Sequence, residues 1–156
     1  MHSIDKQDRL LLSALQQDAS LSILELSEIC HLSAASIQRR IKRLKQAGVI
    51  ERSNFKLNAK LLDKGMTFIV MVEMEREQVD QLDQFKRVAS DDPDVQQCYY
   101  ITGEADFVLI CLTKDMEEFE ALTKRLFFSN NNVRRFTTNV VMSKPKITLN
   151  VPIDLG

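Results

Sequence analysis

Five cationic residues fall within a seven-residue stretch of the sequence that contains no acid: Arg39, Arg40, Lys42, Arg43 and Lys45. Guanidinium and ammonium groups bind phosphates, and a guanidinium also pairs bidentately with guanine. The alternative is a solvated charged face, but such faces usually mix acids with bases. The stretch therefore predicts a surface for a polyanion, and duplex DNA is the polyanion that fits best.

A helix over residues 34–47 would present these cations in an ordered way. Its apolar residues Ile37, Ile41 and Leu44 fall on one side of the helix, at about 100° per residue. Arg40 flanks this stripe, and so does Lys45. The side opposite the stripe carries Ala35, Ser36, Arg39, Lys42, Arg43 and Gln46. The pattern predicts one dry face and one cationic face.

Two shorter helices are expected before it. Asp5 is a candidate N-cap for the first, with Asp8 adding negative charge to its first turn. Ser22 and Glu25 have the spacing of a capping box, and Ser33 is the N-cap candidate of the third helix. Three short helices with a tight turn before the last are typical of a helix-turn-helix.

In a helix-turn-helix the last helix enters the major groove, and its N-terminus favours an anion. Serine hydroxyls there can bind phosphates. The predicted DNA-contacting residues are Ser33, Ala35, Ser36, Gln38, Arg39, Arg40, Lys42 and Arg43. Residues 51–57 could form a small wing or a linker strand. Arg52 and Lys56 there are either further phosphate contacts or loose surface charge.

From Gly65 the hydrophobic pattern changes period. Apolar runs at 66–74, 95–102, 106–113 and 133–142 predict strands. Helical spacing appears at 77–89, and again after the cap candidate Asp115, with Met116, Phe119, Leu122 and Leu126 expected on the inner face. The order β-α-β-β-α-β is that of a ferredoxin-like fold. The predicted fold is α+β, a winged-type helix-turn-helix followed by a ferredoxin-like domain.

We expect three segments: a DNA-binding domain at 1–50, a linker or wing strand at 51–64, and a ferredoxin-like domain at 65–156. Charge supports the division, because residues 1–64 carry 11 Lys/Arg and 7 Asp/Glu, whereas residues 65–156 carry 10 and 15. Both helices of the second domain would cover one sheet face. The other face is also apolar and needs a cover, so a homodimer is expected.

Other classes of protein fit the sequence poorly. No apolar run could span a bilayer and no secretory signal is seen, which favours a cytoplasmic, nucleoid-associated protein without a membrane partner. Cys30, Cys98 and Cys111 form no CxxC pair and are expected to be core residues. The only histidines are His2 and His31, and no catalytic set or metal-spaced cluster occurs. We therefore expect no enzyme, no metal and no cofactor.

Taken together, these features resemble the Lrp/AsnC family of feast/famine regulators over essentially the whole chain. The resemblance lies in the order and spacing of Ile4-Asp5, Leu24 to Ser27, Leu32-Ser33, Arg39 to Leu44, Gly48 to Ile50, Thr102 to Asp106 and Val140 to Met142. One departure is that Ala34 to Ile37 lack the proline that the family often has before its first arginine. This departure bears on base preference rather than on the fold.

The resemblance implies a sequence-specific transcriptional regulator whose dimers assemble further, often into octamers, and bind a small amino acid between dimers. The matching effector residues here are Thr102, Gly103, Glu104, Asp106, Arg134, Thr137 and Thr138. The glycine turn would offer amides to a carboxylate, and Asp106 would pair with an ammonium group. Alternatively, the turn is only a hairpin and Asp106 caps backbone. Met116 and Val140, expected nearby, favour leucine or methionine.

Two further functions remain open at this stage. An effector-independent nucleoid-organising protein would share the fold and the basic helix, but would read DNA through shape and phosphates. A free-standing amino-acid sensor would need only the second domain, and the basic helix argues against it. The steepness of the salt dependence would separate the organiser from a sequence-specific regulator.

Overall fold

The computed structural model of the protein describes residues 4–76 and 78–155, so His2 and the predicted helix start at Glu77 lie outside the described residues. The chain divides into two compact units, which we describe separately. The first contains residues 1–56 together with residues 146–156, and the second contains residues 57–145. The predicted second domain ran to residue 156. The final eleven residues instead belong with the first unit, because they are held by its first helix.

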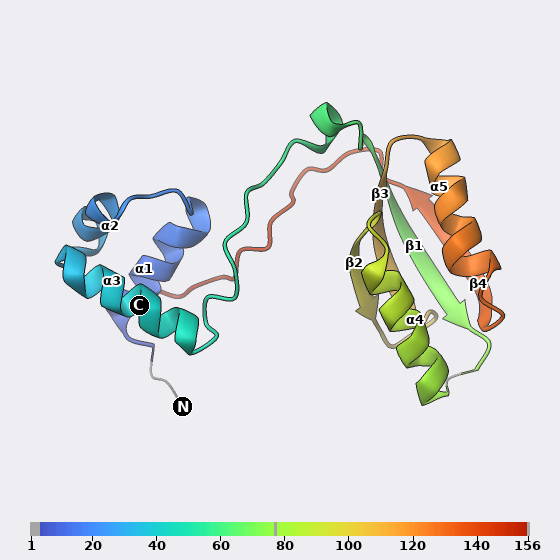
Figure 1. Cartoon of the computed structure of the whole chain (residues 1–156), viewed down its shortest axis with the longest axis horizontal. Coiled ribbons are helices and arrows are strands. Elements are labelled where there is room, and N and C mark those ends of the chain that lie inside the picture. Colours follow the sequence, from blue (N-terminus) through green and yellow to red (C-terminus); the bar gives the residue numbers. More distant parts are fainter. Residues whose placement is uncertain (1–3, 77, 156) are drawn as a thin grey trace. The chain divides into compact units, whose positions relative to one another are not determined.

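Three helices form the first unit: α1 (Lys6–Gln17), α2 (Ile23–Cys30) and α3 (Ala34–Gln46) (Figure 1). Their N-terminal caps are those that the sequence predicts. Asp5 and Asp8 form a capping box on α1, Ser22 and Glu25 form one on α2, and the Ser33 hydroxyl accepts from the α3 backbone. The buried core of this unit consists of Leu11, Ala14, Leu26, Cys30, Ile37 and Leu44.

A tight turn joins α2 to α3. His31 takes the left-handed conformation there, with φ 52°, and its amide donates to the last turn of α2. The Leu32 amide donates to the Ser27 carbonyl at 3.1 Å. Beyond α3, Gly48 has φ 70° and its amide donates to the Lys45 carbonyl, as expected for a residue that ends a helix. These turns fix the angle at which α3 leaves α2.

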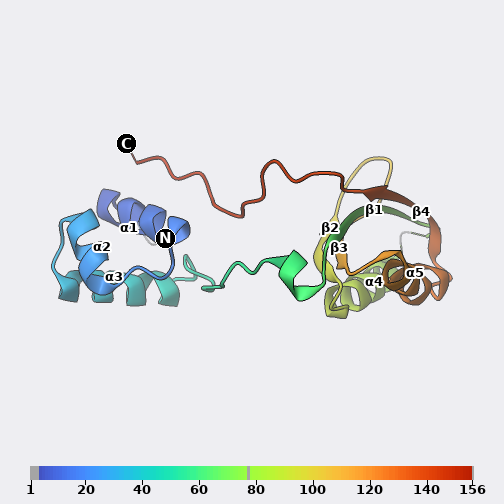
Figure 2. The ribbon, with the colours of Figure 1, turned by 90° about the horizontal axis from the view of Figure 1, so that it is seen from above.

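The second unit is a four-stranded antiparallel sheet in the order β2-β3-β1-β4. The strands are β1 (Met66–Met74), β2 (Val95–Tyr100), β3 (Phe107–Thr113) and β4 (Val133–Val140). Helices α4 (Val79–Asp91) and α5 (Met116–Thr123) cover one face of the sheet (Figure 2), and a π-helical turn, η2 (Lys124–Phe128), continues α5. This is the predicted ferredoxin-like order.

The core of the second unit lies between the sheet and the two helices. The Phe68 ring stacks on Phe119 with centroids 3.7 Å apart, and Phe85 packs against Phe107 at 4.7 Å. Cys111 is buried in this core, and burial raises the pKa of its thiol to about 12. Burial also raises the pKa of Cys30 and Cys98; Cys30 is a core residue as predicted, whereas Cys98 is half-buried and packs against the core.

Three local expectations were wrong. Residues 51–58 contain no strand, because this extended segment has no partner strand in the described chain; a 3₁₀ turn, η1 (Ala59–Leu62), follows it. Met116 is not on the inner face of α5 but 53% exposed, since it is the first residue after the Asp115 cap. The fourth strand ends at Val140 rather than at 142, because the pairing of β4 with β1 ends at the pair formed by Val140 and Phe68.

Candidate DNA interface and effector site

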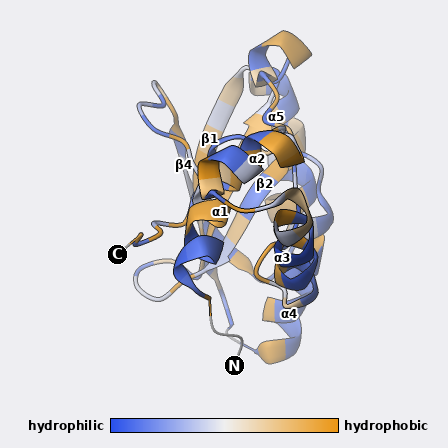
Figure 3. Ribbon diagram, turned by 90° about the vertical axis from the view of Figure 1, so that its left-hand side faces the viewer, coloured by the Kyte–Doolittle hydropathy of each residue, from blue (hydrophilic) through white to orange (hydrophobic). Residues whose placement is uncertain are grey.

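The outward side of α3 is a cationic surface. Arg39 and Lys42 are exposed, and neither forms an ion pair with any residue in the described ranges. Ile37 and Leu44, on the opposite side, are buried in the core. Figure 3 shows α3 largely in the hydrophilic colour, as a helix with one narrow dry stripe should be. Ala35 and Gln38 are exposed beside these cations, and Ser36 is half-buried.

Arg40 and Arg43 behave differently, because both bind acids of α1. The Arg40 Nη1 lies 2.8 Å from Asp5 Oδ2 and 2.7 Å from Asp8 Oδ1. The Arg43 Nη2 donates to the other oxygen of Asp8. The Asp8 side chain is fully buried, and that of Arg40 is 18% exposed. Arg40, predicted to contact DNA, therefore positions α3, while Arg43 remains 44% exposed and shares its charge with Asp8.

The two acids are held by the same cap that starts α1. The Asp8 amide donates to Asp5 Oδ1 at 2.7 Å, and the Asp5 amide donates to Asp8 Oδ2 at 3.2 Å. The Arg40 guanidinium, followed by the Asp8 amide, lowers the pKa of the Asp5 carboxyl. Hydrogen bonds to Asp5 and then Asp8 raise the pKa of Arg40. The capping box thus also clamps α1 to α3.

The start of α3 adds an anion-binding feature. The Ser33 hydroxyl accepts from the Ser36 amide at 3.3 Å, which leaves the other amides of the first turn without an acceptor inside the helix. Those free amides and the positive end of the helix favour a phosphate. They lie on the same helix as Arg39 and Lys42. The exposed part of α3 therefore combines backbone amides that have no acceptor inside the helix with the exposed cations Arg39 and Lys42.

The predicted effector turn follows β2. Gly103 has φ 125°, a conformation that suits glycine, and the space beyond it is open. Asp106 ties this turn to the end of β1. Its Oδ2 accepts from the Met74 amide at 2.6 Å and its own amide donates to the Val72 carbonyl at 2.9 Å. Asp106 thus performs the backbone-capping role weighed above, and its other carboxylate oxygen has no hydrogen bond within the described chain.

The predicted effector residues of β4 do not form one cluster. Thr138 pairs with the buried Val70 and so faces the helices, whereas Thr137 pairs with Met71 on the uncovered face. Arg134 is exposed and falls where the β1–β4 register shifts, opposite Glu73 and Met74.

Within residues 4–76 and 78–155, no hydrogen bond or ion pair joins Thr137, Thr138 or Arg134 to the turn. β1 lies between β3, which leads from the turn, and β4. Thr102, Gly103 and Glu104 are exposed. Within one chain, therefore, the predicted effector residues of the turn and of β4 lie on opposite sides of β1.

Met116 and Val140 are not near the turn. Val140 pairs with Phe68 near the start of β1, whereas Asp106 bonds to Val72 near its end. Four residues of strand separate those positions, which is about 13 Å at about 3.3 Å per residue. Met116 begins the helix that follows β3, next to the strand end where Thr113 pairs with Met66. The expectation that these two apolar residues lie near the turn is therefore wrong, and they do not bear on the identity of an effector there.

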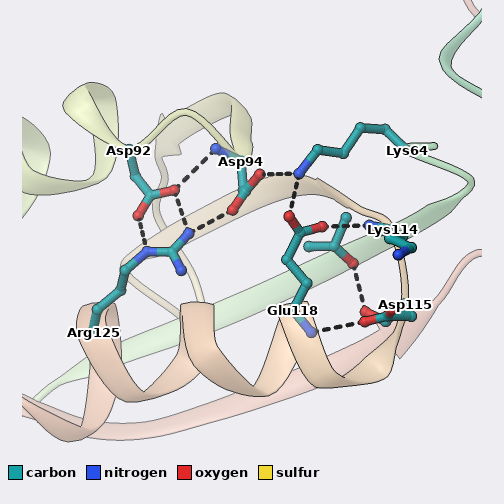
Figure 4. A network of polar contacts seen from close by, with 8 residues as sticks. Lys64, Asp92, Asp94, Lys114, Asp115, Glu118 and Arg125 are labelled. Carbon is teal, nitrogen blue, oxygen red and sulfur yellow. Dashed lines mark hydrogen bonds and ion pairs between the residues drawn. The ribbon is translucent and has the colours of Figure 1, made fainter. Parts of the chain in front are cut away.

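One polar cluster was missed by sequence reasoning (Figure 4). Arg125 binds Asp92 through its Nε at 2.5 Å and Asp94 through its Nη2 at 2.6 Å. Lys64, at the end of the linker, reaches Asp94 at 2.8 Å and Glu118 at 2.5 Å. The acids of this cluster, Asp92, Asp94 and Glu118, have no regular spacing in the sequence. Nothing local signals their cations, which come from 30 or more residues away in sequence.

This cluster is structural rather than a binding site, because each of its three acids already binds Lys64 or Arg125. Burial alone would raise the pKa of Asp92, but hydrogen bonds from Arg125 and from the Asp94 amide outweigh it and lower that pKa. The Lys64 ammonium lowers the pKa of Glu118. Because the pKa of these carboxyls is lower in the folded protein, their ionised forms stabilise the fold. This stability is fully present above the ordinary carboxyl pKa and is lost as the pH falls through the lowered pKa values. No group of residues suited to a metal ion occurs in the part of the chain that the structure describes.

Comparison with known proteins agrees with this architecture. The family described as "Lrp/AsnC ligand binding domain" matches residues 67–151, and "Winged helix-turn-helix DNA-binding" matches residues 4–51. An uncharacterized HTH-type transcriptional regulator of Sinorhizobium fredii is 42% identical over 97% of this chain and 90% of its own length. The chain belongs to the Lrp/AsnC family. Its predicted class, a DNA-binding transcriptional regulator and not an enzyme, is confirmed.

Further relatives extend the similarity to solved structures. The transcriptional regulator AzlB of Bacillus subtilis is 32% identical over 97% of this chain and 96% of its own. A transcriptional regulator of Neisseria meningitidis, solved as an L-Met complex, is 28% identical, with a TM-score of 0.92 over 97% of this chain and 98% of that one. No helix among the described residues is long and apolar enough to cross a membrane.

The ion pairs between α1 and α3 generate a first prediction. Asp8→Asn keeps an oxygen for the capping bond but removes the buried charge shared by Arg40 and Arg43. We expect the free energy of unfolding of the DNA-binding unit to fall by about 2–4 kcal/mol, because a partly buried guanidinium loses its counter-charge. Chemical denaturation of the full chain measures this. Glu28→Gln, which changes an exposed acid of α2, is the control; equal stability of the two variants would contradict the clamp.

Proposed function

We propose that this protein is a sequence-specific DNA-binding regulator whose activity responds to a small amino acid bound between dimers of its second unit. The observation that carries the DNA-binding part is the unpaired charge of Arg39 and Lys42 on the outward side of α3. Arg40 and Arg43 hold that helix against α1, so its orientation is fixed before DNA is bound. Such pre-orientation lowers the cost of fitting side chains into a groove.

We propose that the uncovered face of the sheet is the dimer interface. That face carries a half-buried apolar patch made of Ile69, Met71, Val108, Ile110 and Leu112. A patch of this kind is usually covered by a second protein surface. A two-fold dimer would pair two α3 helices, which then read two half-sites of a pseudo-palindrome.

The effector proposal rests on two separate half-sites that each lack a partner within one chain. The turn at 102–106 supplies backbone amides and one unused oxygen of Asp106, and β4 supplies the exposed Arg134. Further assembly of dimers, up to an octamer, would bring a turn from one subunit to β4 of another. The match to a ligand binding domain and the L-Met complex of the Neisseria relative favour an apolar amino acid, methionine or leucine.

The recognition helix gives a second prediction, which is tested with two matched variants. Arg39→Ala should weaken binding to a selected operator by about 1–3 kcal/mol and relax base preference at one position, if the guanidinium reads a guanine. Lys42→Ala should weaken all sequences alike and lower the slope of log K against log salt by about 1. Fluorescence titration at several salt concentrations measures both, with Gln46→Ala as control.

Equal losses on specific and random duplexes in Arg39→Ala would contradict a base-reading role. A wild-type protein with a steep salt dependence and little sequence preference would instead favour the nucleoid-organising alternative.

The effector turn gives a third prediction. Asp106→Asn retains an oxygen that can accept from the Met74 amide, so the fold should survive, but the negative charge for an ammonium group is lost. We expect the melting temperature without ligand to change little and the shift produced by methionine or leucine to disappear. Thermal-shift screening of the wild type with all twenty amino acids comes first. A full ligand shift in the variant would exclude Asp106 from the site.

The dimer interface gives a fourth prediction. Ile110→Arg places a charge at the centre of the apolar patch, where burial against a second subunit would strip its water. We expect the mass from light scattering to fall to half or less of the wild-type value while circular dichroism stays unchanged. Val88→Arg, at a 42% exposed position on α4, is the control and should keep the wild-type mass. If the Ile110→Arg protein folds and its mass in solution equals that of the wild type, the apolar patch is not the dimer interface.

A further inference from the structure

The C-terminal tail of the chain is held by α1. The Gln16 side chain forms a reciprocal pair with the Val151 backbone: its Nε2 donates to the Val151 carbonyl at 3.1 Å, and its Oε1 accepts from the Val151 amide at 2.7 Å. The Arg9 Nη1 donates to the Asp154 carbonyl at 3.2 Å. An amide side chain that bonds both groups of one residue imitates a neighbouring strand and fixes the register of the tail.

The spacing of these contacts is matched on both sides. Arg9 and Gln16 are seven residues apart on α1, so they share a face and are separated by about 10.5 Å along the axis. Val151 and Asp154 are three residues apart in an extended segment, which spans about 10 Å. The tail therefore runs antiparallel to α1 and meets both anchors at once. Ile153, between the anchors, is partly buried, whereas Leu149 before them is 82% exposed.

The tail and the recognition helix use different parts of α1. Asp5 and Asp8 bind α3, while Arg9 and Gln16 bind the tail. Docking of the tail therefore leaves the cationic side of α3 open. The tail's hydrogen bonds lie at the surface, where each is individually weak, so docking is reversible.

The chain passes between the two units twice, once through the linker at 51–64 and once through residues 141–150. The linker ends at Lys64, which is pinned to the second unit by Asp94 and Glu118 (Figure 4). The tail is pinned to the first unit by Gln16. Each of the two connecting segments is therefore followed or ended by a residue that polar contacts hold to one unit. Two tethers restrict the relative rotation of two bodies far more than one does, because the second must close a loop.

We propose that the C-terminal tail is a strap: its docking on α1 limits rotation of the DNA-binding unit and so sets the half-site spacing that a dimer accepts. This role rests on the proposed DNA-binding function. A single flexible linker would let the two recognition helices adapt to several spacings, at an entropic cost at each binding event. The docked strap removes that freedom before binding. The occupant of the α1 surface is the chain's own tail.

The test compares Gln16→Ala, which removes both bonds to Val151, with Gln17→Ala, an exposed neighbour that makes no side-chain hydrogen bond within the described residues. Hydrogen exchange of the full chain should show the Val151 amide exchanging at least about tenfold faster in Gln16→Ala only. On a selected operator and on one lengthened by two base pairs, the wild type should discriminate between spacings. The ratio of the affinities for the two operators should fall at least about threefold in Gln16→Ala, and equally in a chain that ends at Asn150.

Two results would overturn the strap. Unchanged Val151 exchange in Gln16→Ala means that α1 does not hold the tail, and faster exchange with unchanged spacing discrimination means that docking has no such role. Gln16→Cys combined with Val151→Cys, joined by a short bismaleimide, tests the occupant. On a denaturing gel, a crosslinked product of single-chain size supports the proposal, and a product of twice that size overturns it. The two single variants control for reaction of the native cysteines. Failure of the wild type to bind any duplex would defeat DNA binding itself, while the exchange result would still be readable.

Discussion

One buried carboxylate organises the DNA-binding unit. The Asp8 side chain has no solvent exposure, and removing a carboxylate from water costs several kcal/mol unless it is paired and hydrogen-bonded. Here two guanidinium groups and the Asp5 amide supply that compensation. Because Asp8 lies in the first turn of α1 and its partners lie on α3, the requirement to pair this charge fixes how the two helices meet. Apolar contacts such as those of Leu11 and Ile37 would tolerate several angles, but the ion pairs favour one.

This arrangement divides the cations of α3 into two groups. Arg40, and in part Arg43, neutralise acids within the unit, so they contribute little field outside it. Arg39, Lys42 and Lys45 have no acid to neutralise within the described residues, and their charge remains available to a ligand. A helix with five exposed cations would be held only by its buried apolar residues, and its like charges would repel one another. A helix with some cations facing inward is both anchored and attractive to phosphate, which is the combination that reading a groove requires.

The sequence predicted most of what is local. The caps at Asp5, Ser22 and Ser33, the glycine after α3, and the order of strands all follow from residue type and period within a few positions. What it could not predict depends on contacts distant in sequence. The pairing of Asp8 with Arg40 joins positions 32 residues apart, and a helical wheel gives only the angle of an arginine, not its partner.

The same limit applies to the effector residues. Thr137 and Thr138 seem equivalent in sequence, but strand alternation places them on opposite faces, and the register shift at Met74 decides where Arg134 lies. The tail was assigned to the sheet domain because it follows β4. No local sequence pattern reveals the two hydrogen bonds between the Gln16 side chain and the Val151 backbone. Sequence reasoning locates elements and candidate chemistry, whereas the pairing that selects among candidates is a tertiary property.

The pairing of charges, rather than their number, separates the two units. Residues 1–64 and 65–156 contain 11 and 10 Lys/Arg, nearly the same count. Among residues 65–156, however, several cations lie against an acid, as Lys86, Arg125 and Arg135 do, and so their fields are cancelled within a few ångströms. On α3, Arg39 and Lys42 have no such neighbour in the described chain. The outward side of α3 therefore gathers uncancelled cations on one helix, even though the chain as a whole has a formal charge of −1. Net charge describes solubility; the location of uncancelled charge determines which surface faces DNA.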